Sequence, residues 1–199
     1  MNLWFLSSIE DRLQDGVPET IYTLLTCNIK IWILTGDKQE TAEEIAKQCK
    51  LINYNMFLVN FCKEEEIESK IDLFCTEFDI DLTPKDANNF SSMYYIKDVN
   101  DHGNYDNDYI ISKIRKKCGK DLSIIIDGST LELIFSKEEL CRKFFKLAIS
   151  AISVVCCRVS PKEKANVIKY TKKQGTYRTL SIGDGANDVP MIKEAHIGV

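Results

Sequence analysis

Residues 181–191 read Ser181-Ile182-Gly183-Asp184-Gly185-Ala186-Asn187-Asp188-Val189-Pro190-Met191. A strand-like run, residues 179–182, leads into this stretch, so Asp184 is expected at the carboxyl end of a strand and Asp188 at the start of a helix. Two carboxylates in this arrangement suit Mg²⁺, which prefers hard oxygen ligands together with water and substrate phosphate. The two glycines allow the backbone to bend and to approach a bulky anion. The stretch therefore predicts Mg²⁺-assisted phosphoryl transfer.

A purely structural interpretation of these residues is a turn at Gly-Asp-Gly followed by a helix cap at Asn187-Asp188. That interpretation explains an isolated motif as well as the functional one does. It does not predict that polar clusters also follow two other strand-like segments, which are described below. The coincidence at three strand ends favours a binding site.

The composition limits the class of protein. The 199 residues suffice for one domain with a core and an insertion, and 44% hydrophobic with 28% charged residues is usual for a soluble globular protein. A net charge of −4 and a pI near 5.4 argue against a general nucleic-acid binder. No apolar run approaches the roughly 18 residues that a membrane-spanning helix needs, and residues 1–9 lack a signal-peptide pattern. We expect a soluble segment.

The eight cysteines form no C-x-x-C pair, and the two histidines lie far apart in the sequence. Both observations argue against a zinc site. We expect the cysteines to be reduced packing residues in a cytosolic compartment.

Strand-like and helical segments alternate along most of the chain. The expected strands are residues 30–34, 123–127, 153–157, 179–182 and 196–199. Helices are expected at residues 17–27, after the loop at residues 35–37, and at the starts marked by the capping-box spacings Asp37 with Glu40, Ser136 with Glu139, and Ser160 with Glu163. Asp127-Gly128 is expected to form a turn. The pattern predicts an α/β fold with a mostly parallel sheet and helices on both faces.

Residues 53–121 differ in texture from the rest. They are rich in Asn, Asp, Lys and Glu and show little periodicity. We expect a polar, partly disordered insertion with one short helix, between two parts of a single domain at residues 1–52 and 122–199.

Two further clusters lie at strand ends, where open parallel sheets bind ligands. Thr35-Gly36-Asp37 offers a hydroxyl and backbone N–H groups before a helix, which suits a phosphate, although Asp37 also fits a helix cap. Arg158 and Lys164 flank Ser160-Pro161 and could offset phosphoryl charge, whereas the plainer explanation is two solvated surface cations. Periodicity alone does not decide between Lys162 and Lys164 as the inward-facing lysine.

These motifs together resemble the phosphorylation domain of P-type ATPases, in the phospholipid-transporting (flippase) branch. The matching segments are Ile31-Trp32-Ile33-Leu34-Thr35-Gly36-Asp37-Lys38-Gln39-Glu40-Thr41-Ala42, Cys156-Cys157-Arg158-Val159-Ser160-Pro161, Gly183-Asp184-Gly185-Ala186-Asn187-Asp188, Ile125-Ile126-Asp127-Gly128 and residues 9–20. The resemblance implies a haloacid dehalogenase-like Rossmannoid fold, with Mg²⁺ and ATP as cofactors.

The resemblance also implies roles for individual residues. Asp184 would be a Mg²⁺ ligand with Asp188 beside it, and Asp11 matches an aspartate of a segment that touches nucleotide. Lys164, not Lys162, matches the lysine of the phosphoryl site. The implied catalytic residues are Thr35, Lys164 and Asp184, and the implied ATP or phosphate contacts are Thr35, Gly36, Asp37, Arg158, Lys164, Asn187 and Asp188.

One departure from the family matters. The family's nucleophile is the aspartate of an Asp-Lys-Thr-Gly-Thr motif, which this sequence does not contain. We therefore expect a fragment that is inactive alone, from an enzyme on the cytosolic face of a membrane. The partners implied are ATP, a phospholipid bound by the membrane domain and an accessory subunit, with no nucleic acid. A soluble haloacid dehalogenase-like phosphatase and a non-catalytic ATPase-like regulatory module remain as alternatives.

Overall fold

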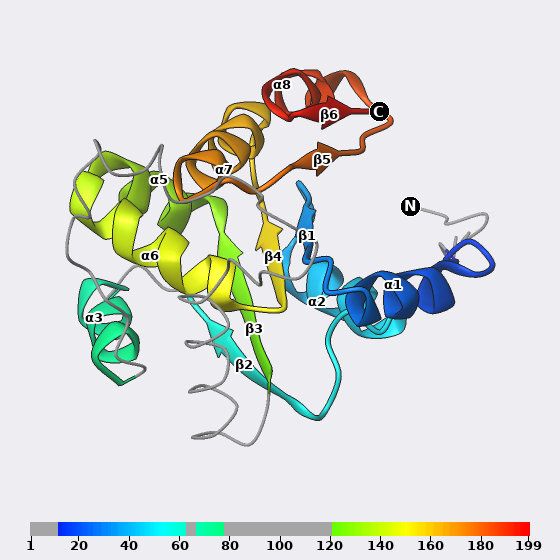
Figure 1. Ribbon diagram of the computed structural model, residues 1–199, viewed down its shortest axis with the longest axis horizontal. Coiled ribbons are helices and arrows are strands. Elements are labelled where there is room, and N and C mark those ends of the chain that lie inside the picture. Colours follow the sequence, from blue (N-terminus) through cyan, green and yellow to red (C-terminus); the bar gives the residue numbers. More distant parts are fainter. Residues whose placement is uncertain (1–11, 63–66, 78–120) are drawn as a thin grey trace, which may run out of the picture.

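The computed structural model describes residues 12–62, 67–77 and 121–199 (Figure 1). Its helices are α1 (Val17–Thr26), α2 (Gln39–Gln48), α3 (Ile67–Glu77), α5 (Gly128–Ser136), α6 (Glu138–Ser150), α7 (Pro161–Lys173), α8 (Val189–Glu194) and the 3₁₀ turn η1 (Ala186–Asp188). Its strands are β1 (Ile31–Leu34), β2 (Met56–Asn60), β3 (Asp121–Asp127), β4 (Ser153–Cys157), β5 (Leu180–Ser181) and β6 (Ile197–Gly198). No helix in the described parts is long and apolar enough to cross a membrane.

Four strands form one parallel sheet in the order β1-β4-β3-β2. The two central strands, β3 and β4, are almost entirely buried, which explains why their sequences are continuous apolar runs instead of alternating ones. Parallel pairing brings the carboxyl ends of β1, β4 and β3 to one edge. The predicted mostly parallel sheet is thus confirmed.

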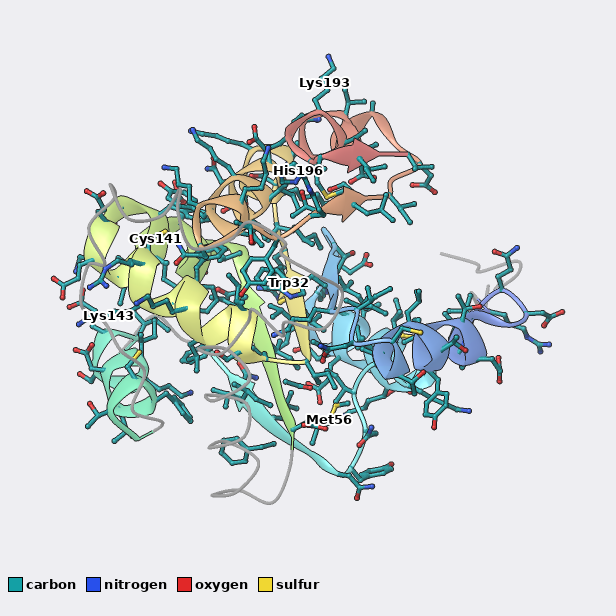
Figure 2. The ribbon with its side chains drawn as sticks, viewed as in Figure 1. Trp32, Met56, Cys141, Lys143, Lys193 and His196 are labelled. Carbon is teal, nitrogen blue, oxygen red and sulfur yellow. The ribbon has the colours of Figure 1, made fainter. Side chains whose placement is uncertain are left out.

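Helices cover both faces of the sheet, as predicted. On one face, α3, α5, α6 and α7 pack against Ile124, Ile126 and Val154 in the larger core cluster. On the other face, α2 places Ala42 and Ala46 against the alternating residues of β3 and β4. Trp32 of β1, labelled in Figure 2, stacks on Phe145 with ring centroids 6.3 Å apart and so joins β1 to α6.

The last part of the chain forms a second, smaller sheet. β5 pairs in parallel with β6, and α8 joins them. Figure 1 shows this unit beyond the carboxyl ends of β1 and β4, next to α7. Lys172 of α7 contacts this unit by donating a hydrogen bond of 2.6 Å to the backbone carbonyl of Glu194.

Two elements differ from the sequence prediction. β2 was not predicted, because its four apolar residues lie among polar ones in a stretch read as insertion; it pairs with β3 from Met56↔Asp121 to Asn60↔Ile125. The short helix expected in the same stretch corresponds to α3, which buries Ile71 and Cys75 against the core. Residues 78–120, the larger part of the predicted insertion, lie outside the described residues.

Asp127-Gly128 was predicted as a turn but starts a helix. The Asp127 carboxylate accepts a hydrogen bond of 2.9 Å from the backbone N–H of Thr130 and thereby caps α5. Two predicted capping boxes are wrong. α2 and α6 begin after Lys38 and Lys137, neither of which makes a side-chain cap, and the hydroxyl of Ser136 instead donates to the carbonyl of Leu133. The third, Ser160 with Glu163, is confirmed.

Candidate functional site

Thr35, Gly36 and Asp37 form a tight polar turn directly after β1. The Thr35 hydroxyl donates a hydrogen bond of 2.7 Å to the Asp37 carboxylate, and the backbone N–H of Asp37 donates to the same hydroxyl oxygen at 3.2 Å. The Asp37 carboxylate is thus used within the turn and does not cap α2. Thr35 is half-buried, whereas Gly36 and Asp37 are exposed at the carboxyl edge of the sheet.

Arg158 follows β4 in a left-handed conformation, with φ of 52°. Its backbone N–H donates to the carbonyl of Asp37 at 2.9 Å, and the N–H of Val159 donates to the carbonyl of Thr35 at 3.0 Å. These two bonds join the loop after β4 to the turn after β1. A non-glycine residue rarely adopts this conformation, and such strain is concentrated at functional sites.

Gly128 supports the same backbone from the end of β3. A Cβ atom at this position would lie 2.3 Å from the carbonyl oxygen of Arg158, so only glycine allows the approach. The sequence pattern predicted Gly128 only as a turn residue, because its close approach to Arg158 depends on tertiary packing. The sequence signal for Gly128 was its position directly after Asp127, the last residue of β3.

Helix α7 starts at Pro161, three residues after Arg158. Ser160 accepts from the backbone N–H of Glu163, and the Glu163 carboxylate accepts from the N–H of Ser160 at 2.6 Å, while Pro161 occupies the first turn. The cap fixes the direction of the helix. One turn in, Lys164 lies only 12% exposed and Lys162 is exposed to solvent.

Lys164 of α7 reaches the loop at residues 183–188, which is called the acidic loop below. Its ammonium group donates a hydrogen bond of 2.7 Å to the carboxylate of Asp188, which is 14% exposed. Of the two lysines that the sequence left open, Lys164 is therefore the one that faces the acidic loop. Its position agrees with the lysine implied by the family resemblance.

The acidic loop is folded around the side chain of Asp188. A Cβ at Gly183 would lie 2.3 Å from the Cβ of Asp188, and the N–H of Asp188 donates to the carbonyl of Gly185 at 2.9 Å. Asp188 does not cap α8 with its side chain, contrary to the structural interpretation of the motif. Asp184 and Asn187 are exposed at the tip of the loop.

The oxygen groups of this loop fit Mg²⁺ in their chemistry. Asp184 forms no ion pair with the residues that the structure describes, and its carboxylate projects from an exposed loop. The Asp188 carboxylate offers a second hard oxygen, although one of its oxygens is paired with Lys164. No group of three or more metal-binding side chains occurs within the described ranges. Two carboxylates completed by water and phosphate oxygens match the way Mg²⁺ is usually held.

The structure thus places the predicted residues in two linked groups. Thr35, Gly36, Asp37 and Arg158 are joined by backbone hydrogen bonds, and Lys164 is joined to Asp188 in the loop that carries Asp184 and Asn187. α7, which begins three residues after Arg158 and carries Lys164, connects the groups. Asp11 lies outside the described residues.

A parallel sheet of this order, with helices on both faces and polar turns at its carboxyl edge, defines an α/β domain of the Rossmannoid type. The profile of the haloacid dehalogenase-like hydrolases matches residues 6–199, and the chain belongs to this family. It is 42% identical over 195 residues to phospholipid-transporting ATPase C887.12 of Schizosaccharomyces pombe. It is 39% identical over 197 residues to phospholipid-transporting ATPase DNF2 of Saccharomyces cerevisiae and 38% identical over 202 residues to phospholipid-transporting ATPase ID of Mus musculus.

These alignments cover 97%, 97% and 100% of the chain, respectively, but only 13%, 12% and 16% of the three relatives. The chain therefore spans less than a fifth of the length of the curated relatives it matches. The family resemblance inferred from the motifs is confirmed.

Proposed function

We propose that this chain is the part of a phospholipid-translocating P-type ATPase that contributes Mg²⁺ and phosphate or nucleotide contacts to aspartyl-phosphate chemistry. The observation that carries the proposal is the Lys164–Asp188 contact of 2.7 Å beside the exposed carboxylate of Asp184. It joins a cation suited to phosphoryl oxygens to the two carboxylates suited to a divalent ion. The similarity to phospholipid-transporting ATPases along the chain supports the same function.

Each residue has a role that its position supports. The Thr35 hydroxyl and the backbone of Gly36 would hold phosphoryl oxygens, because they lie at a strand end before α2, with Gly36 exposed. Lys164 would shift from Asp188 toward a phosphoryl group and neutralise its charge. Arg158, Asp37, Asn187 and Asp188 would contact nucleotide or phosphate. A Mg²⁺ ion held by Asp184 and Asp188 would neutralise charge on the transferred group.

The sheet geometry gives a place for the nucleophile that this sequence lacks. Among the described strands, β1 and β5 each pair on one side only, and Thr35 and Asp184 follow these two strands. A strand carrying the Asp-Lys-Thr-Gly-Thr motif, inserted between β1 and β5, would bring its aspartate between the turn at residues 35–37 and the acidic loop. In the complete enzyme, ATP would then phosphorylate that aspartate, and hydrolysis would drive lipid movement at the cytosolic face of a membrane.

A soluble phosphatase would need a nucleophile within this chain. Asp127 is the aspartate that most resembles one, but its carboxylate caps α5 and accepts a further hydrogen bond of 3.1 Å from Ser129. It also follows β3, which β4 separates from β1. These contacts favour the ATPase segment over the phosphatase.

A titration of the chain with Mg²⁺ and inorganic phosphate, followed by NMR of backbone amides, tests the proposed site. We expect weak binding, with shifts confined to residues 35–37, 158–164 and 183–188. Asp184→Asn should abolish the Mg²⁺-dependent shifts, and Glu132→Gln, which removes an exposed carboxylate on α5, should leave them unchanged. Shifts elsewhere in the molecule, or shifts that survive in Asp184→Asn, would contradict the site.

A further inference from the structure

The two carboxylates of the acidic loop differ in how accessible they are to a cation. Asp184 is exposed and forms no ion pair with the residues that the structure describes. Asp188 is only 14% exposed, and its Oδ1 atom accepts a hydrogen bond of 2.7 Å from the ammonium group of Lys164, which is 12% exposed. A cation can therefore bind Asp184 without breaking an ion pair, whereas at Asp188 it meets Lys164 first.

Packing restricts the carboxylate of Asp188 further. A Cβ atom at Gly183 would lie 2.8 Å from the Cγ atom of Asp188 and 2.9 Å from its Oδ2 atom, so the carboxylate rests directly on the Gly183 backbone. The backbone N–H of Asp188 donates to the carbonyl of Gly185 at 2.9 Å, which fixes the point from which the side chain starts. Because rotation is restricted, Asp188 offers its Oδ1 atom to a metal ion only when Lys164 releases that atom.

Lys164 and Mg²⁺ are competitors for the same oxygen. Two cations on one carboxylate repel each other, and the repulsion is stronger in a partly buried position than in water. Mg²⁺ also loses its water reluctantly and needs near-ideal octahedral geometry, so a crowded oxygen is a poor ligand. A phosphate group changes this balance, because its oxygens give the Lys164 ammonium group another negatively charged partner.

We propose that the Lys164–Asp188 ion pair is a latch that keeps Asp188 from Mg²⁺ until a phosphate-bearing ligand draws Lys164 away. The latch rests on the proposed function, in which Asp184, Asp188 and Lys164 share one site. Without phosphate, Asp184 is the one carboxylate of the pair that binds Mg²⁺, and it does so weakly. With phosphate, Asp188 becomes the second ligand. Mg²⁺ and phosphate then strengthen each other's binding, because such coupling between two ligands is reciprocal.

Titration of the 199-residue chain with Mg²⁺ alone, followed by NMR of the backbone amides of residues 183–188, tests the latch. Lys164→Gln removes the competing charge and should raise the Mg²⁺ affinity by about fivefold or more, the lower end of the usual range for coupled sites. Lys164→Arg keeps a cation within reach of Asp188 and should bind Mg²⁺ as the unaltered chain does. Lys162→Gln, which removes an exposed cation from the same helix, is the matched control and should change the affinity little.

Asp188→Asn distinguishes a latch from general charge repulsion. If Lys164 occupies a metal ligand, the gain in Mg²⁺ affinity from Lys164→Gln should largely disappear when Asp188 is already Asn, because no ligand is left to release. If Lys164 only repels an ion held at Asp184, the gain should be equal in both backgrounds, since independent effects add. Equal gains would overturn the proposal.

Inorganic phosphate gives a test that needs no change at Lys164. It should raise the Mg²⁺ affinity of the unaltered chain, with potassium chloride at equal ionic strength as the control and free Mg²⁺ corrected for its soluble phosphate complex. Asp188→Asn should lose most of this gain. An unaltered chain without the gain, or a gain of the same size in Asp188→Asn, would overturn the latch even where a Lys164 variant does not fold.

The outcomes separate the latch from the proposed function on which it rests. Mg²⁺-dependent shifts that are lost in Asp184→Asn, but are unaffected by Lys164→Gln and by phosphate, would overturn the latch alone. The absence of any Mg²⁺ response at residues 183–188, with or without phosphate, would overturn both. Circular dichroism confirms that each variant keeps its fold.

Discussion

The ion pair between Lys164 and Asp188 joins helix α7 to the acidic loop. Both side chains are mostly buried, at 12% and 14% exposed, and their atoms are 2.7 Å apart. Removing one member leaves the other desolvated and unpaired, which costs more than the pair itself contributes. The same arrangement suits a lysine that changes partners when a phosphoryl group arrives.

Lys164→Ala should lower the free energy of unfolding by about 1–3 kcal/mol, because Asp188 loses its partner in a poorly hydrated position. Lys164→Ala with Asp188→Ala should cost less than the sum of the single changes, since the unpaired charge is gone. Urea unfolding measures all three. The exposed pair Lys47–Glu43, at 2.7 Å within α2, is the control, and Lys47→Ala should leave the free energy of unfolding almost unchanged. Strict additivity at Lys164 and Asp188 would contradict the coupling.

At the scale of elements, the helices α3 and α6 each place a buried thiol, Cys75 and Cys141, in the larger core cluster. Desolvation raises the pKa of Cys75 on α3 to about 11 and that of Cys141 on α6 to about 11, from an ordinary 9.0. The ion pair of Lys143 with Asp72, at 2.7 Å, joins the same helices at their surface, and Figure 2 shows Lys143 on α6 beside α3.

This packing predicts alkaline destabilisation. Between pH 9 and pH 11 the folded chain keeps the two protons that the unfolded chain loses, so stability is complete below pH 9 and falls as pH rises through 11. Each thiol should contribute about 2–3 kcal/mol to the fall. Cys75→Ala lowers stability at pH 7 by leaving a cavity, but should flatten the slope of unfolding free energy between pH 9 and pH 11. Cys27→Ser is the matched control and should keep the slope; an unchanged slope in Cys75→Ala would show that Cys75 titrates normally.

A second prediction at this scale concerns residues 53–121. We expect deletion of residues 98–108, whose composition buries little apolar area, to change the melting temperature only slightly, since loop length costs little entropy. By contrast, Ile71→Ala on α3 should cost about 2–4 kcal/mol, because Ile71 is fully buried in the core. Thermal melts compare the two. A large fall after the deletion would show that residues 98–108 pack against the domain.

The elements that the sequence predicted best are those with strong local signals. β4 was predicted at residues 153–157 from an apolar run, and α7 from a capping box with Pro161, and both occur at these residues. β2 was missed because its run of four apolar residues is short and lies within a stretch that is otherwise polar. Asp127-Gly128 fits a turn and a helix start equally well in sequence, and only the hydrogen bond from Thr130 distinguishes them. Likewise the candidate residues were visible locally, but the choice of Lys164 over Lys162 and the need for Gly128 depend on tertiary contacts.

At the scale of the whole molecule, the two groups of residues in the proposed phosphoryl-transfer site belong to two separate sheets. β1 leads to the turn at residues 35–37, and β5 leads to the acidic loop. α7 contacts the acidic loop through Lys164 and the carbonyl of Glu194 through Lys172. Within the described residues, no strand pairs with both β1 and β5. The sequence contains no Asp-Lys-Thr-Gly-Thr motif that could place a nucleophile there.

We therefore expect that this chain alone does not form a phosphoenzyme from ATP. Covalent transfer needs a carboxylate in line with the γ-phosphate and close to Mg²⁺. Asp184 and Asp188 are the proposed metal ligands, and coordination makes a carboxylate a weaker nucleophile, while Asp127 is held as the cap of α5. Incubation with γ-labelled ATP and Mg²⁺, followed by an acid quench, should leave no acid-stable, hydroxylamine-labile label on the protein. Stoichiometric label that disappears in Asp127→Asn, but persists in the control Asp121→Asn, would identify Asp127 as the nucleophile and replace the ATPase segment with the soluble phosphatase.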